Sequence, residues 1–203
     1  VVKDTPTIIK GGKIEDIANI EAPKYTNLQK ITCSFHGDMQ VKTNMGFTAI
    51  SNIRTGAMVW SKDPNTGAVG YKMVMKTIHS VDPDTTTILV KDQHGYIQTI
   101  ISDGRHPYFA EYGTDANPPS HSLGKEYHGD IPDAYWIDAS NLKPGYRLVS
   151  DDGSWQTVVD VKVERKALNS YNLEVQNYHT FFIKGEEGLN GVWVHNTDCW
   201  VSV

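Results

Sequence analysis

The chain has 203 residues, of which 39% are hydrophobic and 21% charged, an ordinary globular composition with enough apolar material for a core. This length fits one or two domains, and an all-β unit of this size can be a single one. The formal net charge of −5 and the absence of a basic cluster argue against a nucleic-acid partner. No apolar run approaches the roughly 18 residues needed to cross a bilayer and no signal peptide opens the chain, so we expect no membrane partner.

The first part of the chain differs from the rest. Residues 1–32 hold no sustained apolar period, and we interpret them as an upstream flank with a short helix near Ile14–Ile20. The opening Val1-Val2-Lys3-Asp4 has the character of a fragment excised from a longer protein. Beyond the flank, alternating and β-prone runs predict strands at 39–43, 47–50, 58–61, 69–78, 86–91, 96–101, 135–137, 142–149, 157–163, 170–175, 180–183 and 192–194.

Turn signals separate these strands. Residues 63–67 (DPNTG) form a strong turn signal, residues 92–95 (DQHG) predict a hairpin turn, and residues 106–109 (HPYF) are interpreted as a turn. Residues 111–134 are rich in Gly, Pro, Asp and His and predict a long surface loop. No later segment holds a period of 3.6, and strands recur every 8–12 residues, so the expected fold class is all-β with long loops and little helix.

The chain contains two cysteines, Cys33 and Cys199. This count excludes a disulfide scaffold or a four-cysteine zinc site, and leaves either two buried thiols or a single bridge. A metal site at His121 and His128 is disfavoured, because six residues separate them and no cysteine lies nearby. We expect no metal and no cofactor.

The most informative stretch is His195-Asn196-Thr197, which ends an apolar β-prone run. An Asn side-chain amide can attack its own backbone carbonyl, close a succinimide and break the following peptide bond. That reaction is slow before Thr and needs a catalyst, and a preceding His can polarise the carbonyl or protonate the leaving amide. The alternative is that Asn196 simply ends a strand.

Several short motifs occur in one order along the chain. Together they resemble the Hint fold of inteins, bacterial intein-like domains and hedgehog autoprocessing domains, and most closely the Hint domain that precedes toxin modules in bacterial polymorphic toxins. The resemblance implies a horseshoe-like all-β domain over residues 33–196, with flanks 1–32 and 197–203. The motifs are residues 33–38 (CSFHGD), 106–109 (HPYF), 135–139 (YWIDA), 142–145 (LKPG), 171–175 (YNLEV), 179–182 (HTFF) and 194–196 (VHN).

The resemblance implies a self-cleavage reaction that begins at Cys33. Its thiolate would attack the Thr32 carbonyl and convert the amide to a thioester, while His106 donates to the departing nitrogen. The family usually has Thr where Asp103 stands, with Ser102 before it. A carboxylate beside His106 would raise the pKa of His106 and hold its ring, and it would leave fewer neutral donors.

The second cleavage would occur at Asn196. The resemblance implies that Asn196 cyclises with help from His195, while His179 acts as a base or activates the Asn196 amide, two roles that the sequence does not separate. The family usually has Asp where Asn172 stands, and Asn accepts no proton, so the two cleavages would be less tightly coupled. Splicing would use the Thr197 hydroxyl, a sluggish nucleophile beside a thiolate, so we expect cleavage rather than splicing.

The same resemblance brings both junctions together, which makes a Cys33–Cys199 bridge and a redox latch conceivable. The partners implied are the protein's own flanking polypeptides in cis, including a downstream toxin-like module, in a monomeric bacterial protein compatible with export. The alternatives are a slow or inactive Hint spacer and a Cys-His-Asn protease acting in trans. A protease would need an open cleft and an oxyanion hole, which a helix-poor chain with Asn at a junction does not favour.

Overall fold

The computed structural model describes residues 9–10, 13–14, 28–186, 188–196 and 199–202 of the chain. In that part the chain forms strands and two single-turn 3-10 helices, η1 (Ile50–Asn52) and η2 (Ala139–Asn141), without an α-helix. The predicted all-β class is therefore confirmed. The strands are β1 (Ile9–Lys10), β2 (Lys13–Ile14), β3 (Leu28–Ile31), β4 (Phe35–His36), β5 (Gln40–Thr43), β6 (Gly46–Ala49), β7 (Met58–Lys62), β8 (Val69–Asp82), β9 (Thr85–Lys91), β10 (Ile97–Ser102), β11 (Pro107–Glu111), β12 (Ala134–Asp138), β13 (Arg147–Val149), β14 (Trp155–Glu164), β15 (Leu168–Val175), β16 (Thr180–Lys184), β17 (Val192–His195) and β18 (Cys199–Ser202).

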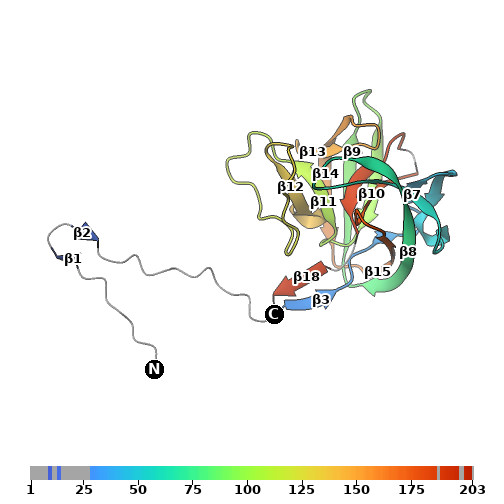
Figure 1. Ribbon diagram of the computed structural model, residues 1–203, viewed down its shortest axis with the longest axis horizontal. Helices are drawn as coiled ribbons and strands as arrows, with labels where there is room; N and C mark the ends of the chain where they lie inside the picture. Colours follow the sequence, from blue (N-terminus) through green and yellow to red (C-terminus); the bar gives the residue numbers. More distant parts are fainter. Residues whose placement is uncertain (1–8, 11–12, 15–27, 187, 197–198, 203) are drawn as a thin grey trace.

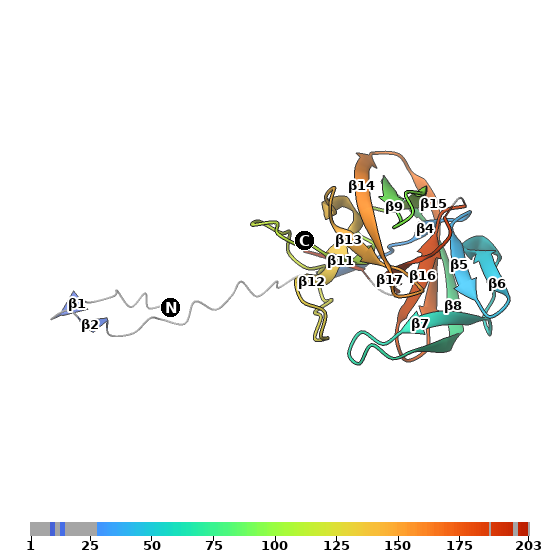
Figure 2. The same ribbon diagram turned by 90° about the horizontal axis from the view of Figure 1, so that it is seen from above.

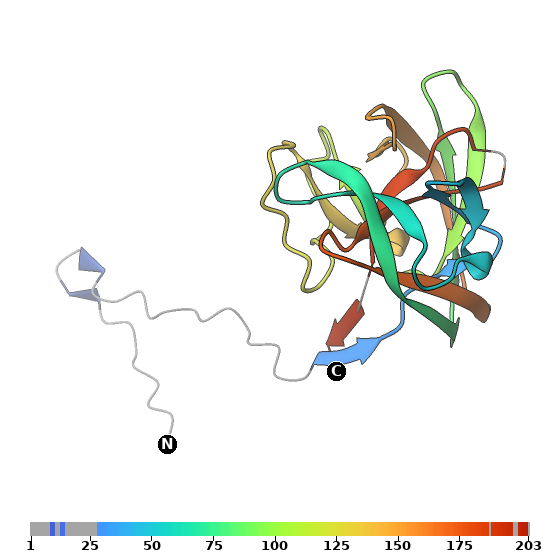
Figure 3. The same cartoon turned by 45° about the vertical axis from the view of Figure 1, so that its right-hand side comes forward.

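One 14-stranded sheet contains most of these strands (Figures 1 and 2). Its neighbours run in the order β12-β11-β13-β14-β9-β10-β4-β15-β8-β7-β5-β16-β17, and β6 pairs with β5 beside this path. The sheet closes on itself because β11 also pairs with β17, at Tyr108 and Val194. The 14-residue strand β8 curves across one face of the domain and pairs with β7 and β15 (Figure 3).

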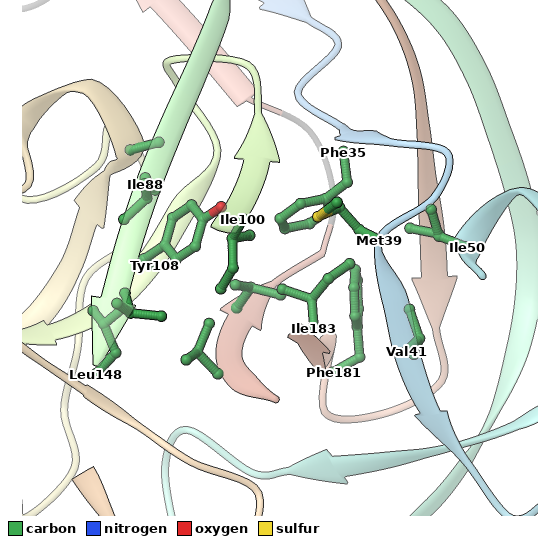
Figure 4. Close-up of a cluster of buried hydrophobic side chains, with 14 of the residues drawn as sticks. Phe35, Met39, Val41, Ile50, Ile88, Ile100, Tyr108, Leu148, Phe181 and Ile183 are labelled. Carbon is green, nitrogen blue, oxygen red and sulfur yellow. The ribbon is translucent and has the colours of Figure 1, made fainter. Parts of the chain in front are cut away.

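Buried and more exposed residues alternate along the strands, so that apolar side chains fill the space inside the closed sheet. β9 and β10 bury Ile88, Val90 and Ile100, while β11 contributes Tyr108, and none of these side chains is exposed to solvent. Figure 4 shows the side chains meeting at the centre of the sheet. Burial of about 25 cal/mol per Å² of apolar surface makes this cluster the main source of stability. A second cluster joins Phe109, Ala134, Trp136, Val149, Phe182 and Trp193.

The structure corrects the sequence interpretation at residues 142–149, where only Arg147–Val149 form a strand (β13), and at residues 106–109. Residues 106–109 do not form a turn, since Pro107 opens strand β11, whose first four residues are buried. A strand that is buried on both faces has a continuous apolar sequence without alternation, and proline is tolerated as the first residue of a strand. β11 is central to the domain, because it pairs with β12, β13 and β17.

The described strands of the two flanks next to the expected domain lie side by side. β3 and β18 pair antiparallel as a separate two-stranded ribbon below the main sheet (Figure 1). Of the short helix expected near Ile14–Ile20, Ile14 belongs to strand β2 and residues 15–20 lie outside the described residues. No helix in the described ranges is long and apolar enough to span a membrane.

Candidate functional site

Strand pairing brings the first junction to two predicted site residues. The short strand β4 begins two residues after Cys33 and pairs with β10, where Phe35 is opposite Ser102, and with β15, where Phe35 is opposite Tyr171. Asp103 comes immediately after β10 and Asn172 lies within β15. The backbone N–H of Asp103 donates to the Ser34 carbonyl at 3.0 Å. The sheet therefore surrounds the residues next to Thr32–Cys33.

Asn172 contacts the backbone of the proposed nucleophile. Its side-chain Nδ2 donates to the Cys33 carbonyl oxygen at 2.8 Å, and its Oδ1 accepts from the Leu173 N–H at 2.8 Å. Asn172 is almost fully buried, so these hydrogen bonds fix its orientation. At this position the amide serves as a donor, a role that an ionised carboxylate cannot fill.

The closure of the sheet brings the second junction to His106. His106 precedes β11, and β11 pairs with β17 through Tyr108 and Val194. Continuing this antiparallel register by two residues places His106 opposite Asn196. The His106 ring lies 4.0 Å from the Phe35 ring, measured between centroids, so it also faces the first junction. His106 therefore lies between the two junctions.

Burial controls the charge of His106. Loss of water contact lowers the pKa of His106 to about 3, helped by the charges of His195 and Lys125, while the backbone at Cys33 and His195 acts in the opposite direction. Within the described residues neither ring nitrogen makes a hydrogen bond of good geometry, although the backbone at Cys33 and His195 favours the protonated ring. The predicted rise of the His106 pKa through Asp103 is therefore wrong, because desolvation outweighs any carboxylate.

Asp103 is itself held in its neutral form. Burial raises the pKa of Asp103 to about 8, and the charges of Asp82 and Asp84 add to this, whereas a backbone hydrogen bond at Ser34 and the charge of Arg105 lower it. At neutral pH most Asp103 carboxyls carry a proton. The expectation that Asp103 removes neutral donors from the site is thus reversed, since a protonated carboxyl is itself a neutral donor.

At the second junction, His195 contacts the Asn196 carbonyl group, which the predicted succinimide formation would attack. Its Nδ1 forms a short hydrogen bond with the Asn196 carbonyl oxygen. A carbonyl oxygen only accepts, so Nδ1 carries the proton. Burial lowers the pKa of His195 to about 3, helped by the charges of Lys125 and His179, so the ring is a neutral donor. The Trp136 ring packs edge-on against it at 5.0 Å.

The Asn196 side chain is buried without hydrogen bonds. It has no exposed surface, and neither Oδ1 nor Nδ2 has a partner in the described part of the chain. A buried unsatisfied polar group costs about 1–3 kcal/mol, and such groups are usual at reactive sites. The Asn196 backbone is fixed, since its N–H donates to the His179 carbonyl at 2.7 Å. The Asn196 side-chain amide therefore makes no hydrogen bond within the described residues, while the Asn196 carbonyl oxygen accepts one from His195.

His179 meets the second junction through its backbone, and the predicted role of its side chain stays a prediction. It is exposed, has a positive φ of 54°, and touches the second junction through its backbone carbonyl. No hydrogen bond of its ring is found among the described residues. Thr197 lies outside the described residues, so its predicted role stays a prediction.

A disulfide joins the two junctions. Cys33 and Cys199 form it across a sequence separation of 166, with their Cα atoms 5.8 Å apart. The bridge that the resemblance made conceivable is thus present, and Cys33 is not a thiol in this state. A cavity of about 510 Å³ opens beside the first junction, lined in part by Thr32, Cys33 and Asn172.

Two contributors were not predicted from the sequence. Asp82 accepts a hydrogen bond from the Thr32 hydroxyl, and Lys125 lowers the pKa of both buried histidines. Asp82 lies in an Asp-Pro-Asp segment that carries only a turn signal, and Lys125 lies in the long loop between β11 and β12. Neither carries a sequence signal that marks it as functional. No group of three His, Cys, Asp or Glu side chains suited to a metal ion occurs within the described ranges.

Comparisons with known proteins agree with this architecture. A family model described as the pretoxin HINT domain matches residues 40–117 and 123–197, which is more than half of the chain. A bacterial intein-like domain from Clostridium thermocellum is 23% identical, with a TM-score of 0.60, over 82% of this chain and 99% of that one. A DnaB intein from Synechocystis sp. PCC 6803 is 14% identical, with a TM-score of 0.55, over 82% and 99%. The gp41-1 intein is 19% identical, with a TM-score of 0.52, over 82% and 100%. No curated protein matches the chain.

Proposed function

The chain belongs to the pretoxin Hint family, and we propose that it is an autocatalytic self-processing domain that cuts its own backbone. The cuts fall at Thr32–Cys33 and Asn196–Thr197, each molecule reacts once, and a C-terminal toxin-like module is released. The domain spans residues 33–196 and acts on its flanks 1–32 and 197–203 in cis, as a monomer without nucleic-acid or membrane partners.

The observation that carries this proposal is the contact between His195 Nδ1 and the Asn196 carbonyl oxygen, beside a buried and unpaired Asn196 amide. Asn196 Nδ2 attacks the Asn196 carbonyl carbon and closes the succinimide. The carbonyl oxygen takes up negative charge, which the His195 N–H stabilises. The bond to the Thr197 nitrogen then breaks, and this nitrogen takes up the proton that Nδ2 gives up on cyclisation and becomes a new amino terminus. Atoms balance without water or cofactor.

The first cut requires a free Cys33 thiol. Its thiolate attacks the Thr32 carbonyl carbon, the Thr32–Cys33 amide breaks, and the nitrogen takes a proton and becomes the Cys33 amine. His106 and protonated Asp103 are the neutral donors near this step, and Asn172 holds the Cys33 carbonyl. An external nucleophile entering through the adjacent cavity then cleaves the thioester. Because the disulfide occupies Cys33, reduction must come first.

The two cuts proceed independently in this proposal. Splicing would need the Thr197 hydroxyl to capture the thioester, and a hydroxyl is a weak nucleophile beside external thiols. The buried Asn196 also argues against a protease acting in trans, because the reacting groups lie within the folded chain. The second candidate is a slow or inactive Hint spacer, and the observation in its favour is the disulfide that removes the Cys33 thiol.

Intact-mass analysis over time tests the proposal. A phosphine reductant opens the disulfide without supplying a thiol, and hydroxylamine is then added to cleave any thioester. We expect loss of residues 1–32 to need both reagents and to disappear in Cys33→Ala. Loss of residues 197–203 should need neither hydroxylamine nor Cys33, and should disappear in Asn196→Ala.

Cys199→Ser is the matched control for the redox requirement, because it removes the bridge and keeps Cys33. It should lose residues 1–32 with hydroxylamine alone. A parent chain that keeps its full mass for days under reducing conditions with hydroxylamine would contradict the proposal and favour the spacer.

A further inference from the structure

A buried carboxylate contacts the residue on the acyl side of the first junction. The Thr32 hydroxyl donates to Asp82 Oδ1 at 2.6 Å, across 50 positions of sequence. Asp82 ends strand β8 and is only 1% exposed, whereas Thr32 is exposed as a residue. The contact therefore anchors an exposed flank residue to the interior of the domain.

The other oxygen of Asp82 is already occupied by the domain. Ser170 Oγ donates to Asp82 Oδ2 at 2.6 Å, and Ser170 is completely buried. A carboxylate can only accept, so Asp82 Oδ1 needs a donor to offset its loss of water. Within the described ranges, the flank supplies that donor through Thr32. Threonine and serine are the residues that can place an O–H one bond beyond Cβ.

We propose that Asp82 is the recognition residue for the amino acid that precedes the first scissile bond, and that it selects a hydroxyl side chain there. This inference rests on the proposed cleavage at Thr32–Cys33, whose substrate is the protein's own upstream flank. A hydroxyl-binding site rejects analogues that lack the hydroxyl far more strongly than an apolar pocket rejects a missing methylene, because its polar group is left unpaired.

The contact matters most in the reactive state. Reduction of Cys33–Cys199 frees the nucleophile and removes the covalent restraint on the junction. The acyl residue is then held by the Thr32–Asp82 hydrogen bond and by the pairing of β3 with β18. Asp82 thereby keeps the Thr32 carbonyl within reach of Cys33, which is an orientation effect on the rate.

Substitutions at position 32 test the inference with little risk to the fold, because this residue is exposed. Thr32→Val keeps the shape and removes the donor, and Thr32→Ser keeps the donor and removes a methyl group. We expect hydroxylamine cleavage after reduction to slow on the order of 10- to 100-fold in Thr32→Val. In Thr32→Ser it should stay within about 3-fold of the parent. Cleavage at Asn196–Thr197 should not change and serves as the internal control for folding.

A second measurement separates this inference from the self-cleavage proposal. The urea midpoint is determined for the oxidised parent, Thr32→Val, Asp82→Asn and the double variant, since oxidised protein keeps Cys33 unreactive. We expect Thr32→Val to lower the midpoint in the parent and to have a smaller effect beside Asp82→Asn. If the parent never cleaves but this coupling is found, the recognition site stands and the cleavage proposal fails. Equal shifts in both backgrounds, or equal cleavage of the Val and Ser variants, would overturn the recognition site.

Discussion

In the self-cleavage that we propose, the second junction depends on one neutral N–H donor. His195 Nδ1 reaches the Asn196 carbonyl oxygen, while burial keeps the pKa of His195 at about 3 and the ring uncharged. A neutral donor aimed at the oxygen where charge develops needs no reorganisation during the reaction. The same burial leaves the Asn196 amide without competing hydrogen bonds. At the scale of single residues, burial thus affects both the proposed donor, His195, and the proposed nucleophile, the Asn196 amide.

Substitution of His195 should therefore slow succinimide formation. We expect His195→Ala to reduce the rate of cleavage at Asn196–Thr197 by about 100- to 1,000-fold, the usual effect of removing one oxyanion donor. His195→Asn, whose amide nitrogen can occupy the Nδ1 position, should retain a substantial part of the rate. The measurement is the appearance of the fragment 1–196 by mass. Equal rates in the alanine and asparagine variants would contradict the assigned role.

Asp103 should give the protein a specific dependence of stability on pH. Its folded-state pKa is about 8, above the usual 3.8, so between these values the folded state binds more protons than the unfolded state. Its contribution to stability is complete below about pH 4 and is lost as pH rises through 8. Asp82, Asp84 and Arg105 are the charges that set this pKa besides burial.

Asp103→Asn is neutral at every pH and should not show this loss. We expect the unfolding free energy of the variant, relative to the parent, to rise with pH from 5 to 8 by up to about 1.4 kcal/mol per pH unit. Urea denaturation of both oxidised proteins measures this difference, and the contributions of His106 and His195 cancel in it. Parallel profiles would show that Asp103 is ionised in the folded state.

At the scale of elements, the register of a few strands positions the site. β4 contributes two residues, yet it pairs with both β10 and β15 and so places Cys33 near Asp103 and Asn172. The closure between β11 and β17 does the same for His106 and Asn196. A slip of one residue in a strand turns its side chains to the opposite face, so packing between strands must keep these registers.

Gly185, just after β16, shows how closely two of these elements approach. A Cβ at Gly185 would overlap the carbonyl oxygen of Thr99 on β10, whereas a Cβ at Gly70 in β8 meets no atom within 4 Å. We expect Gly185→Ala to destabilise the protein by about 1–3 kcal/mol and Gly70→Ala to change stability little. Urea denaturation compares them. Similar losses in the two variants would mean that the backbone of β16 moves freely away from β10.

Some of the strands could be predicted from the sequence and others could not. Strands with alternating residues, such as β9 and β15, were predicted within two residues, because one face of each is less buried than the other. β11 was missed because it is buried on both faces and begins with proline. β3 and β18 were missed because each pairs only with the other, a long-range event with no local signal.

For the site residues too, features with a local sequence signal were predicted and features that depend on long-range contacts were not. Cys33, Asp103 and His106 lie around the first junction, and Asn172, which we had associated with the second cleavage, lies there as well. The direction of the His106 pKa was wrong, because burial cannot be read from neighbouring residues in the sequence. The contact of Asp82 could not be predicted for a similar reason, since its partner Thr32 lies 50 positions away in the sequence. The catalytic roles themselves stay predictions.

At the scale of the whole molecule, the disulfide separates bond cleavage from fragment loss. Succinimide formation conserves atoms, and Cys199 lies beyond the cut while Cys33 lies before it. We expect oxidised protein that has cleaved at Asn196–Thr197 to keep its full mass until a phosphine is added, and then to separate at once. Cys199→Ser should separate without reductant. Loss of residues 197–203 from the oxidised parent would contradict this tether.

The pairing of β3 with β18 has a consequence for how long the products remain together. Four residue pairs form this ribbon, and two-stranded ribbons are marginally stable in water. Once both peptide bonds are cut, upstream and downstream polypeptides therefore form a short-lived complex with each other. While the bridge persists, the downstream polypeptide is instead held by the domain itself. The time for which the downstream polypeptide stays attached is then set by the redox conditions around the protein, and not by the rate of peptide-bond cleavage.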